Sequence, residues 1–140
     1  MLMELFCDWF CGSFNNRMQT FTHPKDARYV LARHEQLYEN LIECSYYYHR
    51  NKTPYRQMTF DVKYNNGSVH LTDSKGKELV FKHKASSFIC ETEHRIDNKV
   101  YVFSAVLTNG LYRVNDQCYD MDGDLVRGLP TKSWFEFKKT

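Results

Sequence analysis

From about residue 28 onward the chain consists of short segments of alternating apolar and polar residues, separated by tight-turn signals. The expected strands cover residues 28–34, 41–49, 55–64, 68–73, 78–84, 87–96, 99–108, 110–116, 117–121 and 132–138. The turn signals are "NNG" at 65–67, "DSKG" at 73–76, "DN" at 97–98, "NG" at 109–110 and "DG" at 122–123. Many short strands joined by tight turns favour an antiparallel sandwich or barrel. We therefore expect an all-β fold of about ten short strands.

One helical pattern precedes these strands. Apolar side chains recur at helical spacing between residues 2 and 19, which predicts a single amphipathic helix over about 2–19. The apolar positions are Leu2, Leu5, Phe6, Trp9, Phe10, Phe14 and Met18. Pro24 disfavours helix at His23, so the helix should end before "THPKD". With 140 residues and neither linker nor repeat, we expect one domain over 1–140, with the barrel over about 28–138.

Charge and composition exclude several classes of protein. The net charge is only +2 and the acidic residues are spread along the chain, so nucleic-acid or membrane binding is not expected. The N-terminal "MLMELFCDWF" is apolar but contains Glu4 and Asp8 and lacks a basic leader, unlike a signal peptide. The five cysteines are an odd number without the spacing of a disulfide framework. We expect a reduced, cytoplasmic protein.

The stretch "SYYYHRNKTPYRQMTFDVKY" at 45–64 contains the first candidate site. Strand alternation places Tyr46 and Tyr48 on one inward face and Arg56 with Met58 on the next, while Tyr55 belongs to the polar face. An unpaired buried guanidinium is costly, so Arg56 needs a partner or a ligand. Alternatively, Arg56 reaches solvent at the strand end and covers apolar surface with its stem. Tyrosines also favour strands without any ligand, so spacing alone leaves both interpretations open.

A wider set of motifs resembles one known family. "WFCGSFNNRMQTF" is followed by "HP", "ECSYYYHRNKTPYR", "SSFICETE" and a closing "WFEF", and this order resembles the T-type phycobiliprotein lyases, the CpcT/CpeT family, over nearly the whole chain. The short versions carried by cyanophages are the most similar in length. The residues that match the family's motifs are Gly12, Phe14, Asn15, Asn16, Gln19, Tyr46, Tyr48, Pro54, Tyr55, Arg56, Cys90 and Asp116.

The resemblance implies a calycin-like antiparallel β-barrel with an N-terminal helix. It also implies that the chain binds a phycobilin, phycoerythrobilin or phycocyanobilin, as substrate, and assists its attachment to a cysteine of a phycobiliprotein β-subunit, of phycoerythrin or phycocyanin. A bilin reductase is the candidate donor, and a homodimer the candidate assembly. No prosthetic group or metal is expected. The implied ligand-binding residues are Tyr46, Tyr48, Tyr55, Arg56, Met58, Cys90 and Asp116.

Among these residues the resemblance gives the catalytic role to Arg56 and Asp116. A planar guanidinium matches a propionate, and a carboxylate can gather the pyrrole N–H groups of a bilin. The acceptor protein supplies the thiol that forms the thioether. This chain would therefore contribute positioning of the reactive ethylidene group and exclusion of water.

Two departures from the family keep other functions open. Met58 stands where family members commonly carry a second arginine, and the segment between the Pro-Tyr-Arg strand and Cys90 is short. A bilin carrier or chaperone without transfer activity is therefore one alternative. A lipocalin-like carrier of another hydrophobic carboxylate is a second. A barrel with a filled core that binds only proteins is a third.

Other sequence features have simpler interpretations. Cys7 and Cys11 are one helical turn apart, but no histidine pair completes a metal site. Cys90 also fits the role of a small buried hydrophobic residue. "DMDGD" at 120–124 would require calcium ligands at Cys118 and Leu129, so we interpret it as a turn. The amides of Asn15, Asn16 and Gln19 either cap and pack the helix end or contact a ligand.

Overall fold

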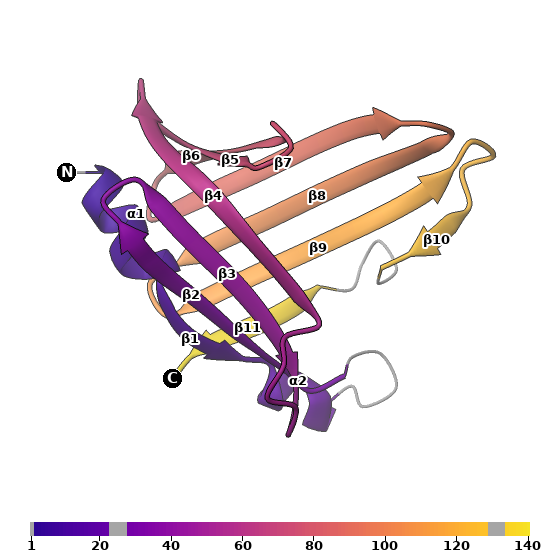
Figure 1. The fold of residues 1–140 in the computed structure, drawn as a ribbon, viewed down its shortest axis with the longest axis horizontal. Helices are drawn as coiled ribbons and strands as arrows, with labels where there is room; N and C mark the ends of the chain where they lie inside the picture. Colours follow the sequence, from indigo (N-terminus) through magenta and orange to yellow (C-terminus); the bar gives the residue numbers. More distant parts are fainter. Residues whose placement is uncertain (1, 23–27, 129–133) are drawn as a thin grey trace.

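The computed structural model describes residues 2–22, 28–128 and 134–140. Figure 1 shows the elements in chain order. They are α1 (Leu2–Phe10), β1 (Gly12–Asn15), α2 (Arg17–Thr22), β2 (Val30–Tyr38), β3 (Leu41–Tyr48), β4 (Arg56–Asn65), β5 (Ser68–Asp73), β6 (Glu78–Lys84), β7 (Ser87–Ile96), β8 (Lys99–Thr108), β9 (Leu111–Asp120), β10 (Leu125–Arg127) and β11 (Phe135–Lys139). Within the described ranges, neither helix is long and apolar enough to cross a membrane.

The strands form a closed antiparallel barrel. Their order is β9-β11-β1-β2-β3-β4-β5-β6-β7-β8, and β8 pairs with β9 again, which closes the sheet on itself. The short β10 pairs with the C-terminal half of β9, beyond the part of β9 that pairs with β11. The predicted all-β, calycin-like barrel with an N-terminal helix is confirmed.

Helix α1 closes one end of this barrel (Figure 1). Phe6 is fully buried, and its ring centroid lies 5.1 Å from that of Phe81 in β6 and 5.2 Å from that of Phe88 in β7. Phe10 lies 5.4 Å from Tyr112 of β9, on another part of the barrel wall. Because its rings contact strands around the circumference, the helix packs across the opening and fills that end with aromatic side chains.

The strand boundaries agree best with the sequence in the middle of the chain. The observed β5, β6, β7 and β8 have the bounds that the alternation predicts. The predicted break between 116 and 117 is wrong, because β9 is one strand whose pairing with β8 runs from Leu111 to Asp120. Strands β1 and β10 were not predicted. The beginning of the expected 132–138 strand lies outside the described residues, and the remainder is β11.

The single helix expected over 2–19 is also wrong. Helix α1 ends at Phe10, and Gly12 has a φ of 137°, a conformation that favours glycine. The chain then extends as β1, which pairs with β2 and β11. Phe14 therefore reaches the core from a strand, whereas Met18 is 55% exposed on α2. The expected helix end at "THPKD" falls on residues 23–27, outside the described part.

Two asparagines fix the segment that follows β1. The Asn15 side-chain oxygen accepts a hydrogen bond from the Arg17 amide at 3.1 Å and caps α2. Asn16 is buried; its amide nitrogen donates to the Arg28 carbonyl, and its oxygen accepts from the Val30 amide, both at 2.7 Å. These contacts support the capping and packing interpretation of both residues.

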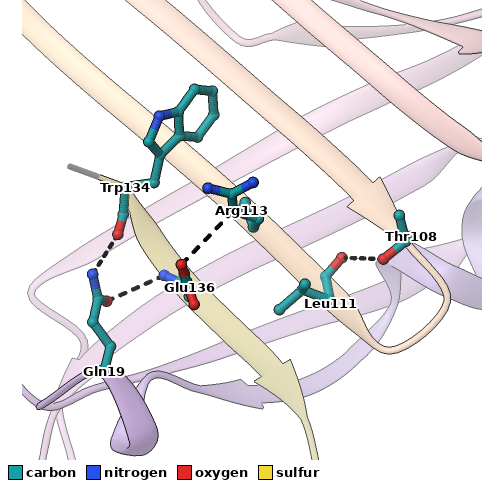
Figure 2. A network of polar contacts seen from close by, with 6 residues as sticks. All are labelled: Gln19, Thr108, Leu111, Arg113, Trp134 and Glu136. Carbon is teal, nitrogen blue, oxygen red and sulfur yellow. Dashed lines mark hydrogen bonds and ion pairs between the residues drawn. The ribbon is translucent and has the colours of Figure 1, made fainter. Parts of the chain in front are cut away.

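The side chain of Gln19 attaches α2 to β11 (Figure 2). Its amide nitrogen donates to the Trp134 carbonyl, and its oxygen accepts from the Glu136 amide at 3.1 Å. The amide group therefore bonds to the backbone at the start of β11, at Glu136 and at Trp134 just before the strand, as a neighbouring strand would. The family-like "GSFNNRMQ" segment thus holds the N-terminal region onto the barrel.

Candidate functional site

Arg56 and Asp116 form an ion pair across the barrel. Arg56 begins β4, Asp116 belongs to β9, and the ring order places four strands between them in either direction, so they project from opposite walls. The Arg56 Nη1 donates to Asp116 Oδ2 at 2.9 Å. This pair lies away from α1, which contacts β4 and lies toward its C-terminal end (Figure 1). The structure thus brings together the two residues to which the resemblance assigns the catalytic role, and it gives Arg56 a partner.

The surroundings keep the guanidinium charged. Burial alone lowers the pKa of Arg56, but the hydrogen bond and the charge of Asp116 outweigh it, and the pKa is raised overall. The side chains are 46% and 22% exposed. A pair with this exposure adds only about 0–1 kcal/mol to stability. The small contribution of this pair to the stability of the fold therefore does little to explain why charged residues occupy these two positions.

The three tyrosines of the expected site lie next to Arg56. Tyr46 is opposite Arg56 in the register of β3 and β4, and burial raises its pKa well above the ordinary value. The chain enters β4 at Arg56, so Tyr55 precedes the strand. Its ring stacks on Tyr48 with centroids 4.1 Å apart and the side chain is half exposed, so Tyr55 lies at the entry to β4 and not on either of its faces. Arg28 lies 5.4 Å from the Tyr48 ring.

Sequence reasoning missed His34, which connects this site to α1. His34 is buried, and burial lowers its pKa to about 4, so the imidazole is neutral near pH 7. Its Nδ1 lies 2.8 Å from the Phe10 carbonyl and its Nε2 lies 3.2 Å from the Tyr46 hydroxyl. Because a carbonyl only accepts, Nδ1 carries the proton, and the Tyr46 hydroxyl donates to Nε2. In the sequence, His34 shares strand alternation with the apolar Val30 and Ala32, and this pattern could have indicated its buried position.

A cleft of about 680 Å³ opens beside Arg56. It exists because β4 pairs with β5 only from Phe60 onward, so residues 56–59 have no strand partner on that side within the described ranges. The lining residues are Arg56, Gln57, Met58, Thr59, Asp73, Ser74, Lys75, Lys77, Ile96 and Tyr101. Small-molecule sites commonly have volumes of about 300–1,000 Å³. The cleft therefore has room for a ligand of the size of a tetrapyrrole.

Cys90 lies apart from this cleft. Its side chain is fully buried in the core, it pairs with Ala105 in β8, and its sulfur lies 3.6 Å from the Thr92 hydroxyl. Burial raises the pKa of this thiol. These contacts agree with the packing role considered for Cys90. The residue is not part of the lining of this cleft.

The "DMDGD" segment has a structural role. In "DMDGD", one Asp120 oxygen accepts hydrogen bonds from the amides of Asp122 and Asp124, and Gly123 has a φ of 85°, so the segment is a turn. Among the described residues, no group of three His, Cys, Asp or Glu side chains is placed to hold a metal ion.

Comparison with solved structures shows a whole-chain likeness. The T-type phycobiliprotein lyase CpeT from Prochlorococcus phage P-HM1 superposes with a TM-score of 0.84 at 25% identity, covering 99% of this chain and 98% of that chain. The CRL protein of Arabidopsis, as its selenomethionine form, superposes with a TM-score of 0.76 at 12% identity, covering 99% and 97%. The second likeness concerns the fold alone.

The sequence matches no protein-family model and no curated protein. The resemblance to T-type phycobiliprotein lyases inferred from the motifs is nevertheless confirmed by the structural neighbour, and that neighbour comes from a phage, as expected for the short versions.

Proposed function

We propose that this chain, similar over its whole length to a T-type phycobiliprotein lyase, binds a phycobilin in the cleft beside Arg56 and assists its attachment to a cysteine of a phycobiliprotein β-subunit. The observation that carries the proposal is the Arg56–Asp116 pair, which lies across the barrel next to that cleft. We call this the open end of the barrel, because residues 56–59 of β4 do not pair with β5 there. Phycoerythrobilin is the preferred candidate, with phycocyanobilin as the alternative.

The two charged groups are complementary to the two kinds of polar group on a bilin. The guanidinium of Arg56 matches a propionate, and the carboxylate of Asp116 can accept hydrogen bonds from pyrrole N–H groups. In the structure these side chains bind each other. Binding a bilin therefore requires an exchange of partners, in which a propionate replaces the carboxylate on Arg56 and pyrrole N–H groups replace the guanidinium on Asp116.

The walls of the cleft suit the flat apolar rings of the ligand. Met58, Ile96 and Tyr101 line it, and Tyr48 stacks on Tyr55 on the β3–β4 side of Arg56. Aromatic and thioether side chains pack well against planar conjugated rings. Tyr46, fixed by His34, holds its position beside Arg56 in the neighbouring strand.

In the reaction the thiol comes from the acceptor protein. Its S–H adds across the exocyclic double bond of the ethylidene group, so that a C–S bond forms and the proton goes to the ring carbon. Cys44 and Cys90 of this chain are buried, and the addition needs neither of them. The role of Arg56 and Asp116 is to hold the bilin in one orientation while the acceptor thiol approaches.

The test is an absorption and fluorescence titration of the purified protein with phycoerythrobilin and with phycocyanobilin. We expect a sharpened, red-shifted spectrum that saturates at a fixed stoichiometry. A spectrum identical to that of the free bilin would contradict the proposal. Uptake of a fluorescent fatty acid in place of the bilin would favour the carrier of another carboxylate.

A second assay distinguishes a lyase from a carrier. The loaded protein is mixed with the β-subunit of phycoerythrin or phycocyanin that lacks its chromophore. A fluorescent band that survives denaturing electrophoresis at the subunit's mass indicates transfer. Saturable binding without such a band indicates a bilin carrier or chaperone. Delivery from a bilin reductase and formation of a homodimer remain predictions.

A further inference from the structure

We infer that Lys77 forms a second anion-binding position in the cleft, so that the site selects tetrapyrroles with two free carboxylates. The inference rests on the proposed function, and it adds a residue that neither alternation nor the family motifs indicated. Lys77 lies after the turn from β5, directly before β6, whereas Arg56 begins β4. Both residues line the same cleft.

The charges that line the cleft are predominantly positive. Arg56, Lys75 and Lys77 contribute three cations, and Asp73 is the acidic lining residue. One Asp73 oxygen accepts hydrogen bonds from the backbone amides of Lys75 and Lys77, at 2.9 and 2.8 Å. These bonds shape the turn, and the carboxylate keeps its negative charge. Arg56 is paired with Asp116, so Lys75 and Lys77 against Asp73 leave an excess of positive charge that favours an anionic ligand.

Lys77 is held in place against the wall of the cleft. Its ammonium lies 5.5 Å from the centroid of the Tyr101 ring, within the range of a cation–π contact. Arg127 also lies near this ring, at 5.8 Å. Within the described part of the chain, Lys77 forms no ion pair with a carboxylate. Its charge is therefore positioned by an aromatic ring and available to a ligand.

The arrangement matches the chemistry of a bilin diacid. The two propionates of a bilin belong to its two central rings, so a site that binds both needs two cations around one cleft. The neighbour of Arg56 on the inward face of β4 is the uncharged Met58. The second cation must therefore come from another element, and Lys77 is the partly buried lysine that faces the cleft from the β5–β6 side.

The experiment measures the affinity of biliverdin and phycoerythrobilin, and of their dimethyl esters, for the wild type and for Lys77→Gln. We expect Lys77→Gln to weaken diacid binding by about five- to tenfold, as for loss of one partly exposed charged contact. The dimethyl ester should bind both proteins equally, and Lys77→Gln should reduce the salt dependence of diacid binding.

Three further variants make the result specific. Lys77→Arg keeps the charge and the contact with Tyr101, so it should retain diacid affinity. Lys63→Gln removes an exposed charge on the outer face of β4 and should leave the affinity unchanged. Lys75→Gln tests the other lysine of the same turn. A loss with Lys75→Gln and none with Lys77→Gln would overturn the assignment.

The outcomes separate this inference from the proposed function. If the wild type binds the diacid and Lys77→Gln binds it equally well, the role of Lys77 is wrong and the bilin site stands. An equal loss for diacid and dimethyl ester would show that Lys77 shapes the cleft and does not bind a carboxylate. If the wild type binds neither ligand, the proposed function fails and the inference fails with it.

Discussion

The two ends of the barrel are built from the same strands but filled in opposite ways. At the α1 end, Phe6 and Phe10 are buried against Phe81 and Phe88. At the other end, Arg56 and Asp116 face each other beside a cleft. Apolar burial stabilises a fold, whereas a half-exposed ion pair adds little. The closed end can therefore supply the stability that allows the open end to hold charged groups.

Strand pairing is also more complete at the α1 end than at the end with the cleft. β4 pairs with β3 from Arg56 onward, but with β5 only from Phe60. β6 pairs with β7 only over 82–84, next to their connecting turn. The barrel wall is therefore continuous near α1 and open toward the cleft. A ligand can enter at the open end without disrupting the aromatic cluster.

The largest expected effect comes from removing a ring at the closed end. Phe6→Ala should lower the free energy of unfolding by about 3–5 kcal/mol, because a fully buried aromatic side chain is lost and a cavity remains. Urea denaturation followed by circular dichroism measures the change. Phe21→Ala is the matched control, because Phe21 is 67% exposed and its loss should cost less than about 0.5 kcal/mol. If Phe6→Ala lowered the free energy of unfolding by no more than the small amount expected for Phe21→Ala, α1 would not stabilise the barrel.

The next effect is a pH dependence that originates at His34. Its pKa is about 4 in the folded protein against an ordinary value of 6.5, so below pH 6.5 the unfolded chain binds a proton that the folded chain does not. Stability should therefore fall as the pH drops from 6.5 to 4, by about 3 kcal/mol in total from this group. Urea denaturation at pH 7, 5.5 and 4 tests this.

His34→Gln should flatten that part of the pH profile, although it also lowers stability at pH 7 by disrupting the contacts with Phe10 and Tyr46. His49→Gln, at an exposed position, should keep the wild-type slope. A His34→Gln profile as steep as that of the wild type would assign the acid sensitivity to other groups.

The sequence was most informative where a local signal determines the structure. Asn66 and Gly67 both have positive φ in the turn between β4 and β5, as the "NNG" signal predicts. Alternation grouped Arg56 with Met58 on one face of β4, and both residues line the cleft, as do Gln57 and Thr59 at the alternate positions. Such features depend on neighbouring residues and can be recognised without knowledge of the tertiary structure.

The errors arose where distant parts of the chain decide. Phe14 continues the helical spacing of Phe6 and Phe10, but Gly12 ends the helix, and pairing with β2 and β11 makes Phe14 part of a strand. The predicted break between residues 116 and 117 is absent because β9 pairs with β8 across both positions, and the Asp116 carboxylate binds a residue 60 positions away. Local propensity contains no information about such a partner.

A smaller effect is expected at the open end, on ligand affinity. Arg56→Ala should weaken bilin binding by about 1–3 kcal/mol, the scale of a hydrogen bond to a charged group. It should change the stability by less than about 1 kcal/mol, because the pair with Asp116 is partly exposed. Arg33→Ala, which removes a 62% exposed arginine from β2, is the control and should alter neither quantity much. Unchanged bilin affinity in Arg56→Ala would remove Arg56 from the site.

The smallest expected effect tests whether β4 can supply a second cation. Met58 lies on the same face as Arg56 and lines the cleft, so Met58→Arg should tighten diacid binding, by about 1 kcal/mol or less because the side chain must leave its contacts with the core. Met58→Gln is the uncharged control for the change in shape. If Lys77 already binds the second propionate, the gain should be small in the wild type and larger in the Lys77→Gln background. Equal or looser binding in both backgrounds would mean that the propionates approach a different part of the open end.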